Sequence, residues 1–324
     1  MVLIHVIIPV HNMKRFLAEA VYSVLHQPYK DIAIILVDDG STDGSSVICD
    51  ELAQRSGRVS VIHQCNAGVS AARNAGIDFV LSHDEASGYI AFLDADDCWK
   101  DGLLDEEMVR LLNHGYDLIG LQTCACTRSL KKLSKPKLLP EGVFPGGVRS
   151  VLLHAKQSFV SMFYSVNLIR QYDLRFVEGL KYAEDKVFSR ECLYLAESVC
   201  LKNREMYLYR NTPGSVMKQR KFGIPYYQPI IEAYLDSDQK MLRWANEKRG
   251  TLLNGRICAS RYIIYMIKEH YQYWGSKKVI DWLLETNPKY LAIVKASLPT
   301  RCYPEIPDTR SMKRNPITLS LGII

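Results

Sequence analysis

The chain has 324 residues, 48% hydrophobic and 23% charged, which is ordinary for a globular protein and enough for one large domain or two modest ones. No apolar run reaches the roughly 18 residues of a membrane span, and the start lacks the basic region and cleavage site of a signal peptide, so neither is expected. Nine scattered cysteines without CxxC spacing favour reduced core thiols, and the eight histidines show no zinc-site spacing.

Basic residues gather toward the end of the chain. From residue 240 onward, fifteen Lys and Arg residues stand against six Asp and Glu residues, a surplus of nine, whereas the net charge of the whole chain is +6. The preceding part is therefore slightly acidic. A basic end behind a near-neutral body indicates an anionic partner surface, either nucleic acid or acidic lipid.

Short apolar runs alternate with helix-spaced segments along the first hundred residues. The runs that predict buried strands are residues 5–9, 32–37, 59–62 and 90–93. The segments that predict helices are residues 17–25, 43–54 and 70–81. The order β-α-β-α-β-α-β, with short connections, predicts an α/β fold with a doubly wound, largely parallel sheet.

Three of these strands end in polar residues, namely residues 9–12 (PVHN), 38–39 (DD) and 94–97 (DADD). The carboxyl ends of parallel strands lie at one edge of a sheet, so we expect these groups to converge on one crevice. The carboxylates of residues 94–97 repel each other unless a cation neutralises them, and a divalent metal with a phosphate on its far side would do so. The alternative is a solvated acidic turn that caps the next helix, with Asp97 as the cap.

Four motifs in this order are similar to those of the family 2 glycosyltransferases. They are residues 6–12 (VIIPVHN), 37–45 (VDDGSTDGS), 66–76 (NAGVSAARNAG) and 92–97 (FLDADD). The resemblance implies the GT-A fold, with a nucleotide-sugar-binding half over residues 1–100 and an acceptor half over 101–215. One departure is His11, where the family usually has Tyr, although either ring can stack on a base.

The resemblance implies roles for the donor site. Asp39 would accept a hydrogen bond from the uracil N3–H, and Pro9 and His11 would form an apolar wall for the base. Asn66, in the motif of residues 66–76, would also contact the nucleotide. Arg73 would contact a phosphate or the base edge, and its alternative is a surface ion pair.

The acidic cluster would then hold the donor diphosphate. Asp96 would coordinate Mg²⁺ or Mn²⁺ bridging the two phosphates. Asp94 would contact the ribose or the donor sugar, or assist the metal.

Two later motifs resemble the catalytic parts of the family. The first is Glu184-Asp185, which opens a predicted helix. The implied role of Asp185 is general base toward an acceptor hydroxyl, with Glu184 orienting the acceptor. The alternative is a pair of carboxylates that merely stabilises a helix N-terminus. The second motif is Arg210 followed by Ser215, which would close over the leaving diphosphate.

Residues 216–324 predict a basic helical region with interleaved aromatic residues. Such helices are typical of contacts with an anionic membrane surface, and the alternative is a helical subdomain packed on the catalytic domain. No nucleic-acid partner is expected. The predicted location is cytoplasmic, either free or at the inner face of the cytoplasmic membrane.

Together these features predict a metal-dependent inverting glycosyltransferase. It would move a sugar from a UDP-sugar to a hydroxyl of a glycan or lipid-linked glycan, as in bacterial lipopolysaccharide, capsule or exopolysaccharide synthesis. Two alternatives stay open: a sugar nucleotidyltransferase, which would need a Gly-rich basic loop after the first strand, and a non-catalytic sugar- or nucleotide-binding protein.

Overall fold

The computed structural model describes residues 2–83, 87–133, 141–144 and 158–211, and residues 229–244 without 231, 235, 238 and 242. The chain forms two units, Met1–Gln219 and Arg220–Ile324. In the second unit the described residues are helical, and the helices predicted farther along lie outside the described residues. The division at residue 215 stays a prediction. Across the part of the chain that is described, no helix is long and apolar enough to cross a bilayer.

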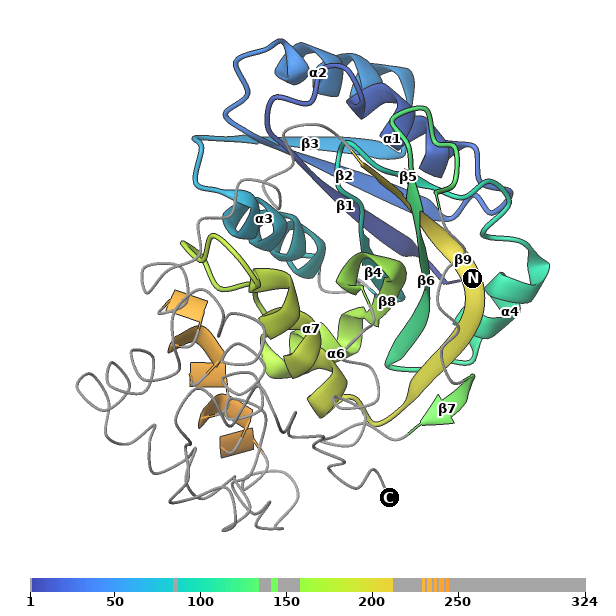
Figure 1. Cartoon of the computed structure of the whole chain (residues 1–324), viewed down its shortest axis with the longest axis vertical. Coiled ribbons are helices and arrows are strands. Elements are labelled where there is room, and N and C mark those ends of the chain that lie inside the picture. Colours follow the sequence, from blue (N-terminus) through green and yellow to red (C-terminus); the bar gives the residue numbers. More distant parts are fainter. Residues whose placement is uncertain are drawn as a thin grey trace, which may run out of the picture. The chain divides into compact units, whose positions relative to one another are not determined.

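The first unit is built on one sheet with helices on both faces (Figure 1). Four parallel strands come first, in the spatial order β3 (Val59–Gln64), β2 (Ile32–Asp39), β1 (Ile4–Val10) and β4 (Tyr89–Phe92). On one side of these strands lie α1 (Leu17–Leu25) and α2 (Ser45–Arg55), and on the other lies α3 (Val69–Leu81). Because β1, β2 and β4 are buried at almost every residue, they carry the continuous Ile, Val and Leu runs typical of a parallel sheet covered on both faces.

Mixed pairing extends the sheet beyond β4. The next strands in space are β8 (Met162–Ser165), β6 (Leu118–Cys126), β9 (Val199–Arg210) and β5 (Cys98–Trp99), with β7 (Gly142–Phe144) paired to β9. β8 runs antiparallel to both neighbours, whereas β6 and β9 are parallel. The other described elements of this unit are α4 (Glu106–Asn113), the 3-10 helix η1 (Phe159–Ser161), α6 (Val166–Tyr172) and α7 (Glu184–Leu195).

An aromatic cluster joins the end of β4 to α7. The Phe92 ring meets the rings of Phe176 and Phe188 edge-on, with centroids 5.2 and 5.7 Å away. Phe176 and Phe188 stack on each other at 4.1 Å. Such pairs contribute about 0.5–1.5 kcal/mol each beyond their buried area. The cluster therefore holds the start of α7 close to the strand end that precedes the acidic residues.

The predicted α/β fold with a mostly parallel sheet is confirmed, with antiparallel pairs in its second half. The predicted strands and helices of the first hundred residues all form, with ends displaced by at most two residues. One expectation about capping is wrong, because α4 is capped by Asp105, whose side chain accepts a hydrogen bond from the Met108 N–H, and not by Asp97.

Candidate active site

Residues of β9 form hydrogen bonds with the acidic turn that follows β4. The Tyr207 hydroxyl accepts a hydrogen bond from the Asp94 N–H at 3.1 Å and donates one to Asp97 Oδ2 at 2.7 Å. The Arg210 N–H donates to Asp97 Oδ1 at 2.6 Å. Burial, together with the charges of Asp94 and Asp96, raises the pKa of the Asp97 carboxyl to about 8. The buried Asp97 carboxyl thus stabilises the turn, while Asp94 and Asp96 are partly exposed.

Arg210 ties the same turn to α1. Its Nε donates to the Asp96 carbonyl at 2.7 Å, and its Nη2 donates to Glu19 Oε2 at 2.8 Å. Its Nη1 donates to the Arg128 carbonyl, and the guanidinium lies over the Phe16 ring. The side chain is buried, and every guanidinium nitrogen has a protein acceptor. A contact between Arg210 and a leaving diphosphate stays a prediction, and its partner in that role, Ser215, lies outside the described residues.

Arg73 links the acidic turn to the start of α7. Its Nη2 lies 2.9 Å from Asp94 Oδ1, and its Nη1 lies 3.1 Å from Glu184 Oε1. The guanidinium also lies over the rings of Phe159 and Phe176, at 4.5 and 5.2 Å from their centroids. Arg73 is buried, so the alternative of a surface ion pair is wrong. A contact between Arg73 and the donor stays a prediction.

Replacing Arg73 with methionine keeps a side chain of similar length over the rings of Phe159 and Phe176 but removes the charge. The carboxylates of Asp94 and Glu184 then lose their shared partner, and breaking a buried ion pair costs about 3–5 kcal/mol. We therefore expect Arg73→Met to lower the free energy of unfolding by that amount in urea denaturation. Arg55→Met is the matched control, because Arg55 is exposed and pairs with Glu51 one helical turn away. It should change stability by less than about 0.5 kcal/mol. Equal effects from the two variants would contradict the assigned role of Arg73.

The two carboxylates at the start of α7 have different surroundings. Glu184 is largely buried beside Arg73, and burial followed by the charge of Asp185 raises its pKa even though Arg73 acts in the opposite direction. Asp185 is partly exposed, and its Oδ1 accepts a hydrogen bond from the Lys186 N–H at 2.8 Å. Of the pair, Glu184 is held by Arg73, and Asp185 is therefore the candidate to meet a substrate.

The end of β2 carries Asp39, the residue expected to read the nucleotide base. Asp39 Oδ1 accepts from Gln64 Nε2 and the Ala67 N–H, both at 2.8 Å, and Oδ2 accepts from the Gly68 N–H at 2.9 Å. A carboxylate has about four acceptor sites, so one is left for a further donor. Asp39 is buried where the loop before α3 closes on β2, and its role in reading the base stays a prediction.

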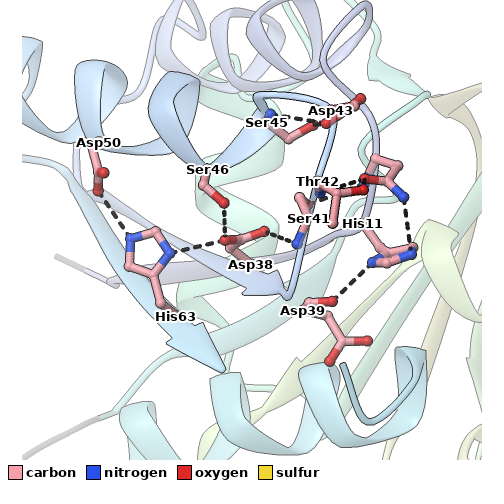
Figure 2. A network of polar contacts seen from close by, with 11 residues as sticks. His11, Asp38, Asp39, Ser41, Thr42, Asp43, Ser45, Ser46, Asp50 and His63 are labelled. Atoms are coloured by element: carbon pink, nitrogen blue, oxygen red, sulfur yellow. Dashed lines mark hydrogen bonds and ion pairs between the residues drawn. The ribbon is translucent and has the colours of Figure 1, made fainter. Parts of the chain in front are cut away.

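Exposed side chains line the approach to Asp39. The His11 ring lies 2.8 Å from the Asp39 carbonyl through Nδ1, and Asn66 Nδ2 lies 3.2 Å from the ring nitrogens (Figure 2 shows His11 and Asp39). Pro9 is partly exposed one residue before the end of β1. Gly40 lets the loop come near, because a Cβ there would lie 2.8 Å from the Asn66 nitrogen. The structure thus brings Pro9, His11, Asp39 and Asn66 to neighbouring strand ends.

The described residues contain no group of three or more His, Cys, Asp or Glu side chains placed to hold a metal. Asp94 and Asp96 nevertheless offer hard oxygen donors that reach the surface. Mg²⁺ is commonly bound by one or two carboxylates together with substrate phosphates and waters, rather than by a complete protein cage. The donor set therefore fits a cation that arrives with a diphosphate.

Several functional contacts have no signal in the local sequence. Glu19 contacts Arg210, Tyr207 contacts Asp94, and Glu184 contacts Arg73, across 191, 113 and 111 residues of sequence. His63 is a further residue that the motifs do not single out, and it bridges Asp38 and Asp50 (Figure 2). Only the pairing of β2 with β3 places it beside Asp38.

Comparison with known proteins identifies the family. The model described as Glycosyl transferase family 2 matches residues 5–166, half of the chain. The chain belongs to glycosyltransferase family 2. The match covers β1 through β8, and with them the strand ends that carry Asp39, Asp94 and Asp96.

Relatives of this family 2 chain carry glycosyltransferase names. The uncharacterized glycosyltransferase EpsJ of Bacillus subtilis is 30% identical over 72% of this chain and 66% of its own length. The glycosyltransferase GlyG of Streptococcus pneumoniae is 27% identical over 72% of this chain and 78% of its own. An uncharacterized glycosyltransferase of Haemophilus influenzae is 33% identical over 60% of this chain and 72% of its own length.

Solved structures of S. aureus TarS share the fold of this family 2 chain. TarS 1–349 in complex with UDP-GlcNAc has a TM-score of 0.60 at 16% identity, covering 92% of this chain and 82% of TarS 1–349. The complex of TarS 1–349 with UDP has a TM-score of 0.62 at 17% identity, covering 95% of this chain and 87% of TarS 1–349. The likeness confirms the predicted GT-A fold.

Proposed function

We propose that this family 2 glycosyltransferase moves a sugar from a UDP-sugar to a hydroxyl of a glycan acceptor, with inversion at the anomeric carbon. One observation carries the proposal: Arg73 joins Asp94 of the acidic turn to Glu184, the neighbour of Asp185. A donor-binding carboxylate and a partly exposed candidate base are thereby fixed on the two sides of one guanidinium. That is the arrangement a direct displacement needs, with acceptor and donor sugar meeting between them.

The chain's own residues supply most of the chemistry. Asp185 takes the proton from the acceptor hydroxyl, and the oxygen attacks the anomeric carbon from the face opposite the UDP, so no covalent enzyme intermediate forms. Asp94 and Asp96 hold the diphosphate side of the donor, and a bound Mn²⁺ or Mg²⁺ would neutralise charge on the departing UDP. Arg73 and Glu184 fix the donor half and the acceptor half of the site relative to each other. Arg210, with Ser215, would close over the leaving group.

Uracil as the base is supported by Asp39 and by the fold likeness. One acceptor site of the Asp39 carboxylate is left for the uracil N3–H, a donor that cytosine lacks at that position. TarS, whose fold the chain shares, has been solved with UDP and with UDP-GlcNAc. We extend the uracil nucleotide to this chain and leave the sugar open.

The acceptor and location are part of the same proposal. We propose a glycan or lipid-linked glycan of bacterial lipopolysaccharide, capsule or exopolysaccharide, met at the inner face of the cytoplasmic membrane. The surplus of nine positive charges from residue 240 onward supports an anionic membrane surface as the meeting place.

A thermal-shift screen of nucleotide sugars with Mn²⁺ tests the donor class. A ligand that binds only the folded state stabilises it by about 2.7 kcal/mol at a concentration 100 times its Kd. We expect UDP and at least one UDP-sugar to raise the melting temperature, and CDP, GDP and ADP to have little effect. An equal shift with CDP would contradict the role of Asp39 in reading the base.

A further inference from the structure

His63 bridges two carboxylates on the side of β2 away from Asp39 (Figure 2). Its Nδ1 lies 2.9 Å from Asp38 Oδ2, and its Nε2 lies 3.0 Å from Asp50 Oδ1. Asp38 is the partner of His63 in the register of β2 and β3, and Asp50 lies on α2. The imidazole is half-exposed, while the Asp38 side chain is buried. Three elements therefore meet at one ring.

Only the charged form of His63 satisfies both partners. A neutral imidazole has one donor and one acceptor nitrogen, whereas an ionised carboxylate only accepts, so the neutral ring would place a lone pair against one of them. Hydrogen bonds to Asp38 and then to Asp50 accordingly raise the pKa of His63. Burial acts to raise the pKa of Asp38, but hydrogen bonds from Ser41, Ser46 and His63 lower it overall. The pair is thus a buried carboxylate held by an imidazolium.

Asp38, whose position His63 restrains, also forms hydrogen bonds with the segment that follows β2. The Ser41 N–H donates to Asp38 Oδ1 at 3.1 Å, and the Ser46 hydroxyl donates to Oδ2. Ser41 Oγ in turn accepts from the Asn12 N–H at 3.1 Å, and Asn12 Oδ1 accepts from the Thr42 N–H at 2.8 Å. Asn12 follows His11 and has a left-handed backbone, with φ of 56°, which these bonds help to hold.

We infer that His63 is a positioning residue for the nucleotide pocket: its imidazolium fixes Asp38, and through Ser41 and Asn12 it sets the wall formed by His11. The inference rests on the proposed function, since it takes UDP to be the nucleotide that this wall contacts. Its consequence is that UDP affinity depends on the charge of a residue that does not touch UDP.

The sign of the pH dependence follows from the groups that face the ring. These are Asp38 from β2 and Asp50 from α2. The Cys49 thiol, also on α2, has its pKa raised to about 12 by burial and then by the charges of the same Asp38 and Asp50. The thiol therefore stays neutral. A histidine with a raised pKa is charged below that pKa and loses its charge as pH rises through it. UDP affinity should therefore fall at a pH above 6.5, the ordinary pKa of histidine.

Calorimetric titration of UDP from about pH 5.5 to 8.5 tests the inference. We expect His63→Gln to bind UDP about tenfold more weakly at the acidic end, because a charge-assisted hydrogen bond is replaced by a neutral one. Its affinity should then lose the alkaline fall seen in the wild type. The ionisation of UDP itself is common to all titrations and cancels in the ratio of variant to wild type. In turnover assays KM for the donor should rise, with kcat at saturating donor unchanged.

Two further variants keep the test decisive. Asp50→Asn retains His63 and Asp38 and removes an exposed partner of the ring. Its UDP affinity should match that of the wild type at acidic pH, but the alkaline fall in affinity should begin at a lower pH than in the wild type. His26→Gln is the control, because His26 is exposed at the end of α1 and stacks on Tyr22, and it should keep the wild-type profile.

The outcomes separate this inference from the proposed function. If His63→Gln binds UDP as the wild type does, or binds it more weakly with an unchanged pH profile, the positioning role is wrong and the proposed function stands. If the wild type binds no UDP at any pH, the proposed donor is wrong and the inference falls with it.

Discussion

Asp185→Asn should lower the rate of sugar transfer by at least about 100-fold, the lower end of what general-base catalysis contributes. The amide has almost the same shape as the carboxylate but cannot take the acceptor proton. The Lys186 N–H that donates to Asp185 Oδ1 can still donate to an amide oxygen, so the start of α7 should keep its structure. Single-turnover assays with saturating donor measure the loss directly, and UDP affinity should not change.

Asp173→Asn is the matched control for this variant. Asp173 is exposed at the end of α6 in a left-handed conformation that asparagine also adopts, and it should have no effect on transfer. Near-wild-type transfer by Asp185→Asn would remove Asp185 from the mechanism. A loss of UDP binding in that variant would assign it to the donor site instead.

Asp96→Ala should abolish the part of UDP affinity that depends on Mn²⁺, because the cation would be held by this carboxylate together with the substrate phosphates. The variant should fold, since the Arg210 Nε donates to the Asp96 backbone carbonyl, which alanine retains. Calorimetry with and without Mn²⁺ gives the metal-dependent share. Asp101→Ala, an exposed carboxylate a few residues along, is the control and should bind as the wild type does. Unchanged affinity of Asp96→Ala in Mn²⁺ would rule out the metal role.

The architecture of the donor half could be predicted because its signals are local. Apolar runs of four to eight residues, such as residues 32–37, gave strands because both faces of a parallel sheet are buried. Strand ends in such a sheet share one edge, so Asp39 at the end of β2, and Asp94 and Asp96 just after β4, could be placed at the same edge. The order of strands beyond β4 could not be predicted, because antiparallel β8 enters between β4 and β6 from a distant part of the chain.

The contacts between donor and acceptor halves could not be predicted, because they join residues with no periodic relation. Arg73 was expected to face a ligand, yet the fold places it between two carboxylates from opposite halves. One alternative made Asp97 the cap of the next helix, but Tyr207 and Arg210 reach it from β9, and Asp105 takes the capping position. Long-range partners of this kind decide whether a carboxylate in a motif faces substrate or supports the fold.

UDP formation tests the central claim most directly. Wild-type protein is incubated with Mn²⁺, a panel of UDP-sugars and a bacterial glycan extract as acceptor, and free UDP is measured beside an Asp185→Asn sample. We predict UDP release that requires both a UDP-sugar and the extract and that falls by about 100-fold or more in the variant. Absence of UDP release, combined with pyrophosphate release from UTP and a sugar 1-phosphate, would contradict the account and identify a nucleotidyltransferase.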